Sequence, residues 1–239
     1  MIRDEPKLRK EFLIVMTNVF FRPWVGDNYR TAGFNGKRIL VLGESCYCGE
    51  CPDCIEYDDA GDFIPPEKEE GKDFEMCREK IPDVVTGFLA YTEGKPKDWS
   101  MKTYRCFTDI FMGHECTPEE TKAFWHSFVL YNYIQTALEK PRIPPKPWQW
   151  KTGKKPFFEV LAEYNPNVII VWSRELWNNM PSGFQVDDSF QNRWKEGLRY
   201  YNNGKRDIPA YACYHPSTYP TYLNEEDTLY FKRLLEKIA

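Results

Sequence analysis

The stretch Ile39-Leu40-Val41-Leu42-Gly43-Glu44-Ser45 decides the fold that we expect for this chain. Its first four residues are all apolar, which is typical of a strand in a sheet that is covered on both faces. The strand ends abruptly at Gly43-Glu44-Ser45, and the cysteine-containing run Cys46-Tyr47-Cys48 follows at once. The sequence therefore raises the question of whether this strand end carries a catalytic loop, a metal site or both.

Three further segments have the composition of strands. Segment 128–134 is crowded with β-branched and aromatic residues; it could continue the helix before it, but we favour a strand. Segments 168–172 and 208–214 are short apolar runs. Because these strands alternate with helical segments, we predict an α/β fold over residues 1–239. It would be a single three-layer α/β/α domain with a short, mostly parallel, four-stranded central sheet.

Helices are expected from apolar spacing and from capping residues. Leu8, Phe12 and Met16 predict an amphipathic helix over 5–20, within an N-terminal helical extension over 1–36. Thr117-Pro118-Glu119-Glu120 matches a capping box, and Asn224 is a candidate N-cap for the last helix. The remaining expected helices are 74–92, 156–164 and a short one from Arg174. Residues 49–73 are expected to form a long acidic loop that contains cysteines.

Composition limits the classes of protein that fit. The chain has 239 residues, a formal net charge of −4 and eight cysteines. Its apolar runs are too short to cross a bilayer and its N-terminus lacks the pattern of a signal peptide, so we expect a cytoplasmic protein without a membrane partner. We also expect a monomer, although the sequence leaves the oligomeric state open. The net charge disfavours indiscriminate coating of nucleic acid but permits a local basic groove. The basic stretch 142–155, with Trp148 and Trp150, is either such a surface or an ordinary linker.

Three polar clusters directly follow predicted strands. They are Gly43-Glu44-Ser45, Asn132 and His215-Pro216-Ser217. In an open parallel sheet, ligands bind beyond the carboxyl ends of the strands, near the point where the strand order reverses. Each cluster alone has an ordinary explanation as a loop residue, a turn cap or a structural histidine. Together they favour a functional site.

These motifs resemble, in order and rough spacing, those of the uracil-DNA glycosylase superfamily. The first family motif begins Gly-Gln-Asp-Pro-Tyr-His in one branch and Gly-Glu-Ala-Pro-Gly in another; this chain has Gly43-Glu44-Ser45-Cys46-Tyr47-Cys48. A family strand that ends in Asn resembles Val129-Leu130-Tyr131-Asn132, and Phe-Leu-Leu-Trp-Gly resembles Ile169-Ile170-Val171-Trp172-Ser173. The last motif, His-Pro-Ser-Pro-Leu, resembles His215-Pro216-Ser217-Thr218-Tyr219. The resemblance covers roughly residues 37–225.

The resemblance implies catalytic roles for Glu44, Ser45 and His215. His215 would donate a hydrogen bond to O2 of the departing pyrimidine and so stabilise its negative charge. The best-known branch uses an Asp to orient water, and Ser45 stands at that position. Glu44, which matches the glutamate of the second branch, is the nearest replacement. The departure at Ser45 leaves the substrate open.

The resemblance also implies substrate-binding roles. Gly43 would lie against the base pocket, and Asn132 would read the Watson–Crick edge, since its amide both donates and accepts. Tyr47 would line the pocket beside C5 of the pyrimidine, and Ser217 would bind a DNA phosphate. Tyr219 would replace the leucine that fills the gap left in the duplex.

The expected activity is therefore that of a monofunctional DNA glycosylase with DNA as its partner. It would flip out uracil or a modified pyrimidine and hydrolyse the N-glycosidic bond, leaving an abasic site for repair. Excision of phage-type modified cytosine in antiviral defence is the other role that the family suggests. The alternatives are a non-catalytic nucleic-acid-binding module on the same fold and a nucleoside N-glycoside hydrolase.

The dense cysteines predict either a metal site or reduced thiols, with equal weight. Thiolates at two-residue spacing suit structural zinc, and an iron–sulfur cluster fits less well. The four preferred ligands are Cys48, Cys51, Cys54 and Cys77. Cys46 is a substitute ligand, and His114 with Cys116 is a more distant option. Cys106 and Cys213 are expected to be buried packing residues, and no cofactor is required for the chemistry.

Overall fold

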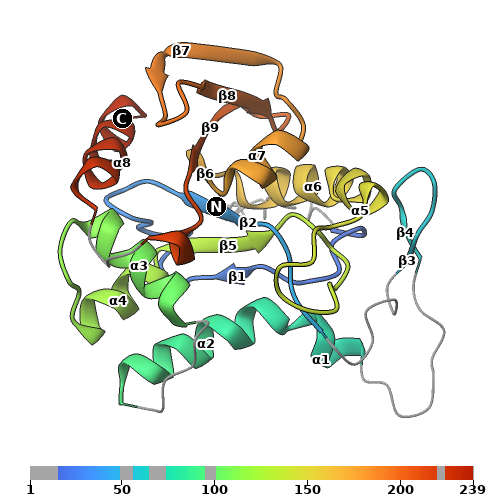
Figure 1. Cartoon of the computed structure of the whole chain (residues 1–239), viewed down its shortest axis with the longest axis horizontal. Coiled ribbons are helices and arrows are strands. Elements are labelled where there is room, and N and C mark those ends of the chain that lie inside the picture. Colours follow the sequence, from blue (N-terminus) through green and yellow to red (C-terminus); the bar gives the residue numbers. More distant parts are fainter. Residues whose placement is uncertain (1–15, 49–55, 65–73, 95–100, 220–223, 239) are drawn as a thin grey trace, which may run out of the picture.

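A seven-stranded mixed sheet forms the centre of the molecule in the computed structural model, which describes residues 16–48, 56–64, 74–94, 101–219 and 224–238 (Figure 1). In spatial order its strands are β1 (Trp24–Val25), β5 (Phe128–Asn132), β2 (Ile39–Gly43), β6 (Val168–Trp172), β9 (Asp207–Cys213), β8 (Gly197–Asn202) and β7 (Gln185–Gln191). The four adjacent strands β5, β2, β6 and β9 are parallel, whereas β1, β8 and β7 join antiparallel.

The four strands expected from the sequence are those that form the parallel centre. Segment 128–132 is a strand and does not continue the preceding helix. The predicted number of strands, four, was nevertheless too small, because β1, β7 and β8 extend the sheet on both sides. Strand β7 has the polar sequence QVDDSFQ with one buried residue, so it lacks the apolar signal by which the central strands were found.

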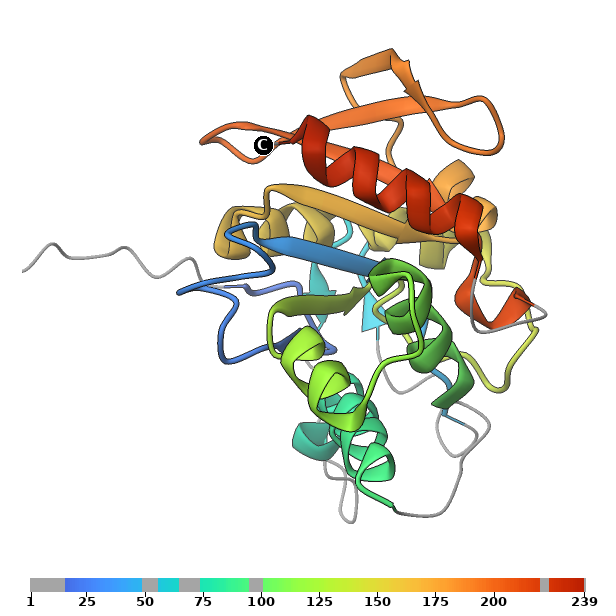
Figure 2. The ribbon, with the colours of Figure 1, turned by 90° about the vertical axis from the view of Figure 1, so that its left-hand side faces the viewer.

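Helices pack on both faces of the sheet. Along β2, Ile39 and Val41 belong to one apolar cluster, and Leu40 and Leu42 belong to the other, as expected from the alternation of side chains along a strand. The first cluster contains side chains of α2 (Lys80–Thr92), α3 (Met101–Met112), α4 (Pro118–Trp125) and α8 (Glu225–Lys237), which are seen from the side in Figure 2. The second contains side chains of α6 (Lys154–Tyr164) and α7 (Arg174–Asn179).

Two predicted helix starts are confirmed in detail. The Thr117 side chain accepts from the Glu120 backbone N–H while the Glu120 carboxylate accepts from Thr117 N–H, which completes the capping box of α4. The Asn224 side chain caps α8 by accepting from Asp227 N–H at 3.1 Å. The predicted helix 74–92 is divided at Glu79 into α1 (Phe74–Arg78) and α2. None of the helices in the described part of the chain is long and apolar enough to cross a membrane.

The expectation of an N-terminal helical extension is wrong for residues 16–36, which form turns and β1. The reason is a tertiary contact. The side-chain oxygen of the fully buried Gln135 accepts from the backbone N–H groups of both Phe20 and Phe21 at 2.9 Å. These N–H groups are thereby paired outside any helix, and the apolar residues around them enter the core. Residues 1–15 of that prediction lie outside the described ranges.

Part of the predicted acidic loop is an ordered hairpin. Strands β3 (Glu56–Tyr57) and β4 (Phe63–Ile64) pair antiparallel. The hairpin packs beside α5 (Pro147–Thr152), a helix within the basic stretch 142–155, and beside α6. The hairpin and the two helices line a cavity of about 780 Å³.

Candidate functional site

The strand order places the predicted site residues along one edge of the sheet. Strand β2 comes first in the chain among the parallel strands; β5 pairs with one side of it and β6 with the other, so the strand order reverses at β2. Ligand sites of open α/β sheets lie at such a reversal. Asn132, Glu44 and His215 lie at or just beyond the ends of β5, β2 and β9. Three strand spacings, or about 14 Å, separate β5 from β9.

Asn132 lies directly against Gly43. The two residues are partners in the register of β5 and β2, and a Cβ atom on Gly43 would occupy the space of the Asn132 amide oxygen. The Asn132 amide nitrogen donates to Cys46 Sγ at 3.1 Å, and the Asn132 carbonyl accepts from Gln135 at 2.7 Å. Glycine at position 43 therefore leaves room for the asparagine amide beside the end of β2, and a larger residue would displace the end of the Asn132 side chain.

We expect Gly43→Ala to disturb this arrangement. The new methyl group would displace the Asn132 side chain, with a loss of about 1–3 kcal/mol in the free energy of unfolding. The matched control is Gly87→Ala on α2, where the added Cβ meets only the end of Met101 at 3.9 Å. Chemical denaturation should show the control to be neutral or more stable by about 0.5–1 kcal/mol. Equal stability of the two variants would contradict the close packing.

The Glu44 carboxyl group has a pKa near neutral pH. Its side chain is partly buried just beyond β2, and burial raises its pKa from 4.5 to about 7; the nearby Glu175 on α7 adds to the shift. A carboxylate with such a pKa can accept or release a proton at physiological pH.

The residues after Glu44 also differ in exposure. The Ser45 hydroxyl is buried, whereas Tyr47 is 38% exposed. Burial raises the pKa of the Tyr47 phenol, and the nearby Ser45 hydroxyl opposes the shift. Cys46 is buried, and this burial raises the pKa of its thiol to about 11, so the thiol is neutral at pH 7. The Cys46 thiol thus packs against Asn132. Because it is neutral, it is not activated as a nucleophile.

His215 has a defined tautomer. It precedes the 3-10 turn η1 (Pro216–Thr218), and its Nδ1 accepts from the Ser217 backbone N–H at 3.3 Å, with the Ser217 hydroxyl 2.7 Å away. Because a backbone N–H can only donate, the proton of the neutral ring lies on Nε2. Burial lowers the pKa of His215 to about 4, so the ring is neutral at pH 7. Its Nε2–H is an uncharged hydrogen-bond donor.

The last motif also contains an exposed and a buried residue. Ser217 is exposed, as a phosphate-binding residue would be. Tyr219 is only 5% exposed, and burial raises its phenol pKa, with the Asp227 carboxylate of α8 adding to the shift. Tyr219 therefore anchors the motif against α8 and does not project from the surface. The expectation that it acts as a wedge in DNA is not supported by this position.

A strained residue follows β6, the strand beside β2. Ser173, directly after β6, has φ 96° and ψ 148°, a conformation almost restricted to glycine. Its hydroxyl accepts from Leu176 N–H at 3.1 Å and caps α7, the helix that carries Glu175. The sequence offers no sign of this strain, because serine at a helix N-cap is ordinary.

A row of aromatic and cationic side chains includes Tyr214, the residue before His215, and sequence reasoning missed it. Trp194, between β7 and β8, packs edge-on against Tyr214 with ring centroids 5.2 Å apart. Arg174 lies over the Trp194 ring at 5.7 Å, and Arg193 over the Tyr214 ring at 5.6 Å. Both arginines are also paired with carboxylates, Arg193 with Asp227 at 2.9 Å and Glu226 at 2.6 Å and Arg174 with Glu196 at 3.8 Å. Tyr214 is 37% exposed, so part of this row faces solvent.

Residues 148–155 of the basic stretch lie beside the β3–β4 hairpin. Trp148 on α5 is 42% exposed, but Lys155 pairs with Asp62 of the β3–β4 hairpin at 2.6 Å. The cavity of about 780 Å³ is lined partly by these residues and by none of the site residues predicted from the sequence. An acidic hairpin thus partly neutralises the basic stretch, which the sequence left open as either a DNA-contacting surface or a linker.

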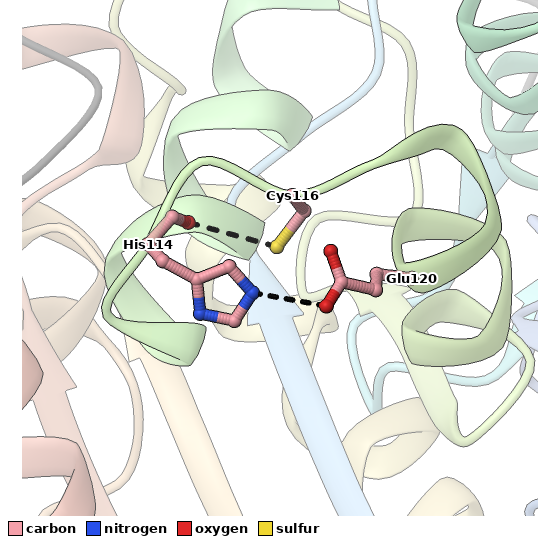
Figure 3. A group of neighbouring side chains, drawn as sticks. All are labelled: His114, Cys116 and Glu120. Atoms are coloured by element: carbon pink, nitrogen blue, oxygen red, sulfur yellow. Dashed lines mark hydrogen bonds and ion pairs between the residues drawn. The ribbon is translucent and has the colours of Figure 1, made fainter.

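The predicted cysteine ligands are only partly within the described residues. Cys51 and Cys54 lie outside them; Cys48 is beyond β2 and Cys77 is on α1. Cys106 and Cys213 are buried, as expected. A different group comes together: one ligand atom each of His114, Cys116 and Glu120 lie within 4.8 Å of one another (Figure 3). This group could hold a metal ion.

Comparison with known proteins does not add to these observations. No protein-family model matches the chain, and no curated protein matches it significantly.

Proposed function

We propose that this chain is a DNA glycosylase related to the uracil-DNA glycosylase superfamily. It would flip uracil or a modified pyrimidine out of DNA and hydrolyse the N-glycosidic bond, with a three-layer α/β/α domain as its scaffold. The observation that carries the proposal is the position of Asn132, Glu44 and the neutral His215 after three of four adjacent parallel strands. This edge contains the strand-order reversal at which such folds bind ligands.

The chemistry follows from the charge that develops as the bond breaks. The electron pair of the C1′–N1 bond passes to the base, and the sugar becomes an oxocarbenium-like cation. His215 Nε2–H donates to the anionic O2 of the base. A neutral donor suits this task because it stabilises the negative charge without protonating the pyrimidine before the bond breaks. Water adds to C1′ and loses its proton to ionised Glu44. The products are an abasic site and the free base, which takes up a proton.

Recognition of the base would use the residues around Gly43. The Asn132 amide can donate to and accept from a pyrimidine edge once it leaves Cys46 Sγ, its partner without substrate. Tyr47 is exposed enough to contact a flipped base, and in the position that the resemblance implies it would exclude C5 substituents. Ser217 is the candidate phosphate contact. Uracil is therefore the first substrate to test, and modified cytosines are the second.

A base-release assay tests the proposal. Purified protein would be incubated with single- and double-stranded DNA that contains uracil, hypoxanthine, mismatched thymine, 5-hydroxymethylcytosine or its glucosylated form. Abasic sites and free base would be measured. Release of one base supports the proposal; release of uracil indicates repair, and release of a phage-type base indicates defence. Absence of any abasic product, with the protein folded, contradicts it.

One observation favours a second candidate, a nucleic-acid-binding module without catalysis. Ser45 stands where the best-known branch has its water-orienting Asp, and a hydroxyl cannot balance a cationic sugar. DNA binding without base release from any substrate would support this candidate. Restoration of activity by Ser45→Asp would point to lost chemistry on an intact site.

The row around Trp194 is our candidate DNA-contacting surface. We expect Trp194→Ala to weaken single-stranded DNA binding by about 10-fold, because a base–aromatic stack contributes about 1–3 kcal/mol. Trp194→Phe should retain most of the affinity. The matched control is Trp148→Ala, which removes an exposed tryptophan from the basic stretch on α5. Fluorescence anisotropy at fixed salt would compare them, and a larger loss in the control would assign binding to α5 instead.

We also propose a four-cysteine zinc site. A structural metal held by Cys48, Cys51, Cys54 and Cys77 would tie the loop after β2 to α1. The Cys51→Ser/Cys54→Ser variant should bind one metal equivalent fewer than the wild type, and metal analysis of both proteins measures this difference.

A further inference from the structure

The connection between α3 and α4 brings three metal-ligating side chains together. His114 and Cys116 come from the loop after α3, and Glu120 comes from the first turn of α4. Figure 3 shows the imidazole, thiol and carboxylate converging on one small space, with the ring of His114 directed at the Glu120 carboxylate. The three ligand atoms lie within 4.8 Å of one another.

The distances are close to those of a tetrahedral metal site. With Zn–N and Zn–O bonds of about 2.0 Å and tetrahedral angles, nitrogen and oxygen ligands lie about 3.3 Å apart. With a Zn–S bond of about 2.3 Å, a thiolate sulfur lies about 3.5 Å from nitrogen. His114 Nε2 and Glu120 Oε1 are 3.1 Å apart. The pair therefore needs almost no adjustment to share an ion. Cys116 Sγ, which donates to the His114 carbonyl at 3.7 Å, lies within 4.8 Å of both ligand atoms and would have to move closer to them.

The backbone around the three ligands is already held in place. Cys116 N–H donates to Asp109 Oδ1 at 2.9 Å, which fixes the loop against α3. Thr117 N–H donates to Glu120 Oε2 at 2.8 Å, so the capping box uses one carboxylate oxygen and leaves Oε1 directed at His114. A ligand set held in this way loses little conformational entropy when it binds an ion.

The donor set and its charge indicate which ion fits. A thiolate and a neutral imidazole favour zinc over the hard cations calcium and magnesium, which prefer oxygen ligands. One thiolate and one carboxylate neutralise the two charges of Zn²⁺. His114 is exposed and the other two side chains are partly buried, so a fourth position would face solvent and take water.

We propose that His114, Cys116 and Glu120 bind one Zn²⁺ ion, which joins the end of α3 to the start of α4. The ion would stabilise the entry into α4 and hence into β5, the strand that ends at Asn132. This site is separate from the four-cysteine motif and does not depend on the proposed glycosylase activity.

Zinc titration of the full-length chain tests the proposal, with the four-cysteine motif removed as a competing ligand set. The Cys51→Ser/Cys54→Ser variant would be stripped with a chelator and titrated with Zn²⁺ against a chromophoric competitor. We expect it to bind one equivalent. Adding Cys116→Ser or His114→Ala should weaken the affinity at least about 100-fold, since each change removes a direct ligand. The matched control is Glu115→Gln, which alters the neighbouring exposed carboxylate that pairs with Arg105.

A second readout identifies the sulfur ligand directly. Co²⁺ in place of Zn²⁺ should produce a thiolate-to-cobalt charge-transfer band in the Cys51→Ser/Cys54→Ser variant and in the Glu115→Gln control. The band should disappear with Cys116→Ser. Circular dichroism of the metal-free variants would confirm that they are folded. Failure of the Cys51→Ser/Cys54→Ser variant to bind zinc, or unchanged affinity and spectrum after Cys116→Ser, would overturn the assignment.

Discussion

Replacing His215 by alanine should reduce the rate of base release by about 10²–10³-fold, the usual effect of removing one donor to a developing anion. The ring is oriented by Ser217, whose backbone N–H donates to Nδ1, so Nε2–H is the ring's single N–H donor. Because the ring is partly buried at the end of β9, its loss should remove chemistry more than folding. Single-turnover assays on the preferred substrate would measure the effect.

The matched variant His215→Gln separates hydrogen bonding from shape. Glutamine keeps an uncharged N–H donor and should recover part of the rate, while alanine should not. DNA affinity should change little in either variant. The pKa of His215, about 4, lies below its ordinary value of 6.5, so the ring is neutral at both pH 6 and pH 8. Titration of His215 should therefore not change the rate of base release in this range. Wild-type rates in His215→Ala would refute the role of the ring.

Replacing Glu44 by glutamine should lower the rate by about 10²–10⁴-fold, since glutamine cannot accept a proton from water. In the wild-type protein, the rate should rise as pH increases through about 7, because the ionised carboxylate is the active form and its pKa is about 7. Single-turnover rates from pH 5.5 to 8.5 would show this ionisation. A flat profile in the wild-type protein would contradict the assignment.

The control for this profile is Glu175→Gln. Glu175 is exposed on α7 and its negative charge helps to raise the pKa of Glu44. Removing the charge should move the profile to lower pH and leave the maximum rate nearly unchanged. A shift to higher pH would show that another group controls the reaction.

Glu44→Gln should also stabilise the protein above neutral pH. The pKa of Glu44 is raised from 4.5 in the unfolded chain to about 7 in the fold, so the folded state holds the proton more tightly. In the wild type, the tighter proton binding contributes to the free energy of unfolding below pH 4.5, and this stabilisation is lost as pH rises through 7. The variant should therefore be more stable by about 1–3 kcal/mol at pH 8 and no more stable at pH 4. Denaturant unfolding at both values measures this difference.

The central strands were predictable because their residues are buried on both sides. Strand β2 is fully buried, and such a strand must be apolar at every position. The antiparallel pair β7–β8 has no such requirement on its outer strand, where five of the seven residues are exposed, so its sequence resembles a loop. The helix expected over 5–20 failed in residues 16–20 because Gln135, more than a hundred positions away, binds the backbone there.

The candidate site divides in the same way. The motifs at the strand ends identified Glu44, Asn132 and His215, because polar residues after an apolar strand are visible in the sequence. The sequence did not show the contact of Asn132 with Gly43 or the pKa values of Glu44 and His215. They depend on strand register and on the solvent that neighbouring elements exclude. Tyr219 is the clearest case, since only its packing beside Asp227 shows that it is an anchor.

The sequence by itself determined the four parallel strands, the capping of α4 and α8 and the residue types at the strand ends. These features depend on local burial patterns and on contacts within a few residues. Only the tertiary structure decided the order of the strands, the tautomer and neutrality of His215, the row around Trp194 and the group formed by His114, Cys116 and Glu120. The physical reason is that each of these depends on groups brought together by folding, and the free energy of such contacts has no counterpart in local sequence pattern.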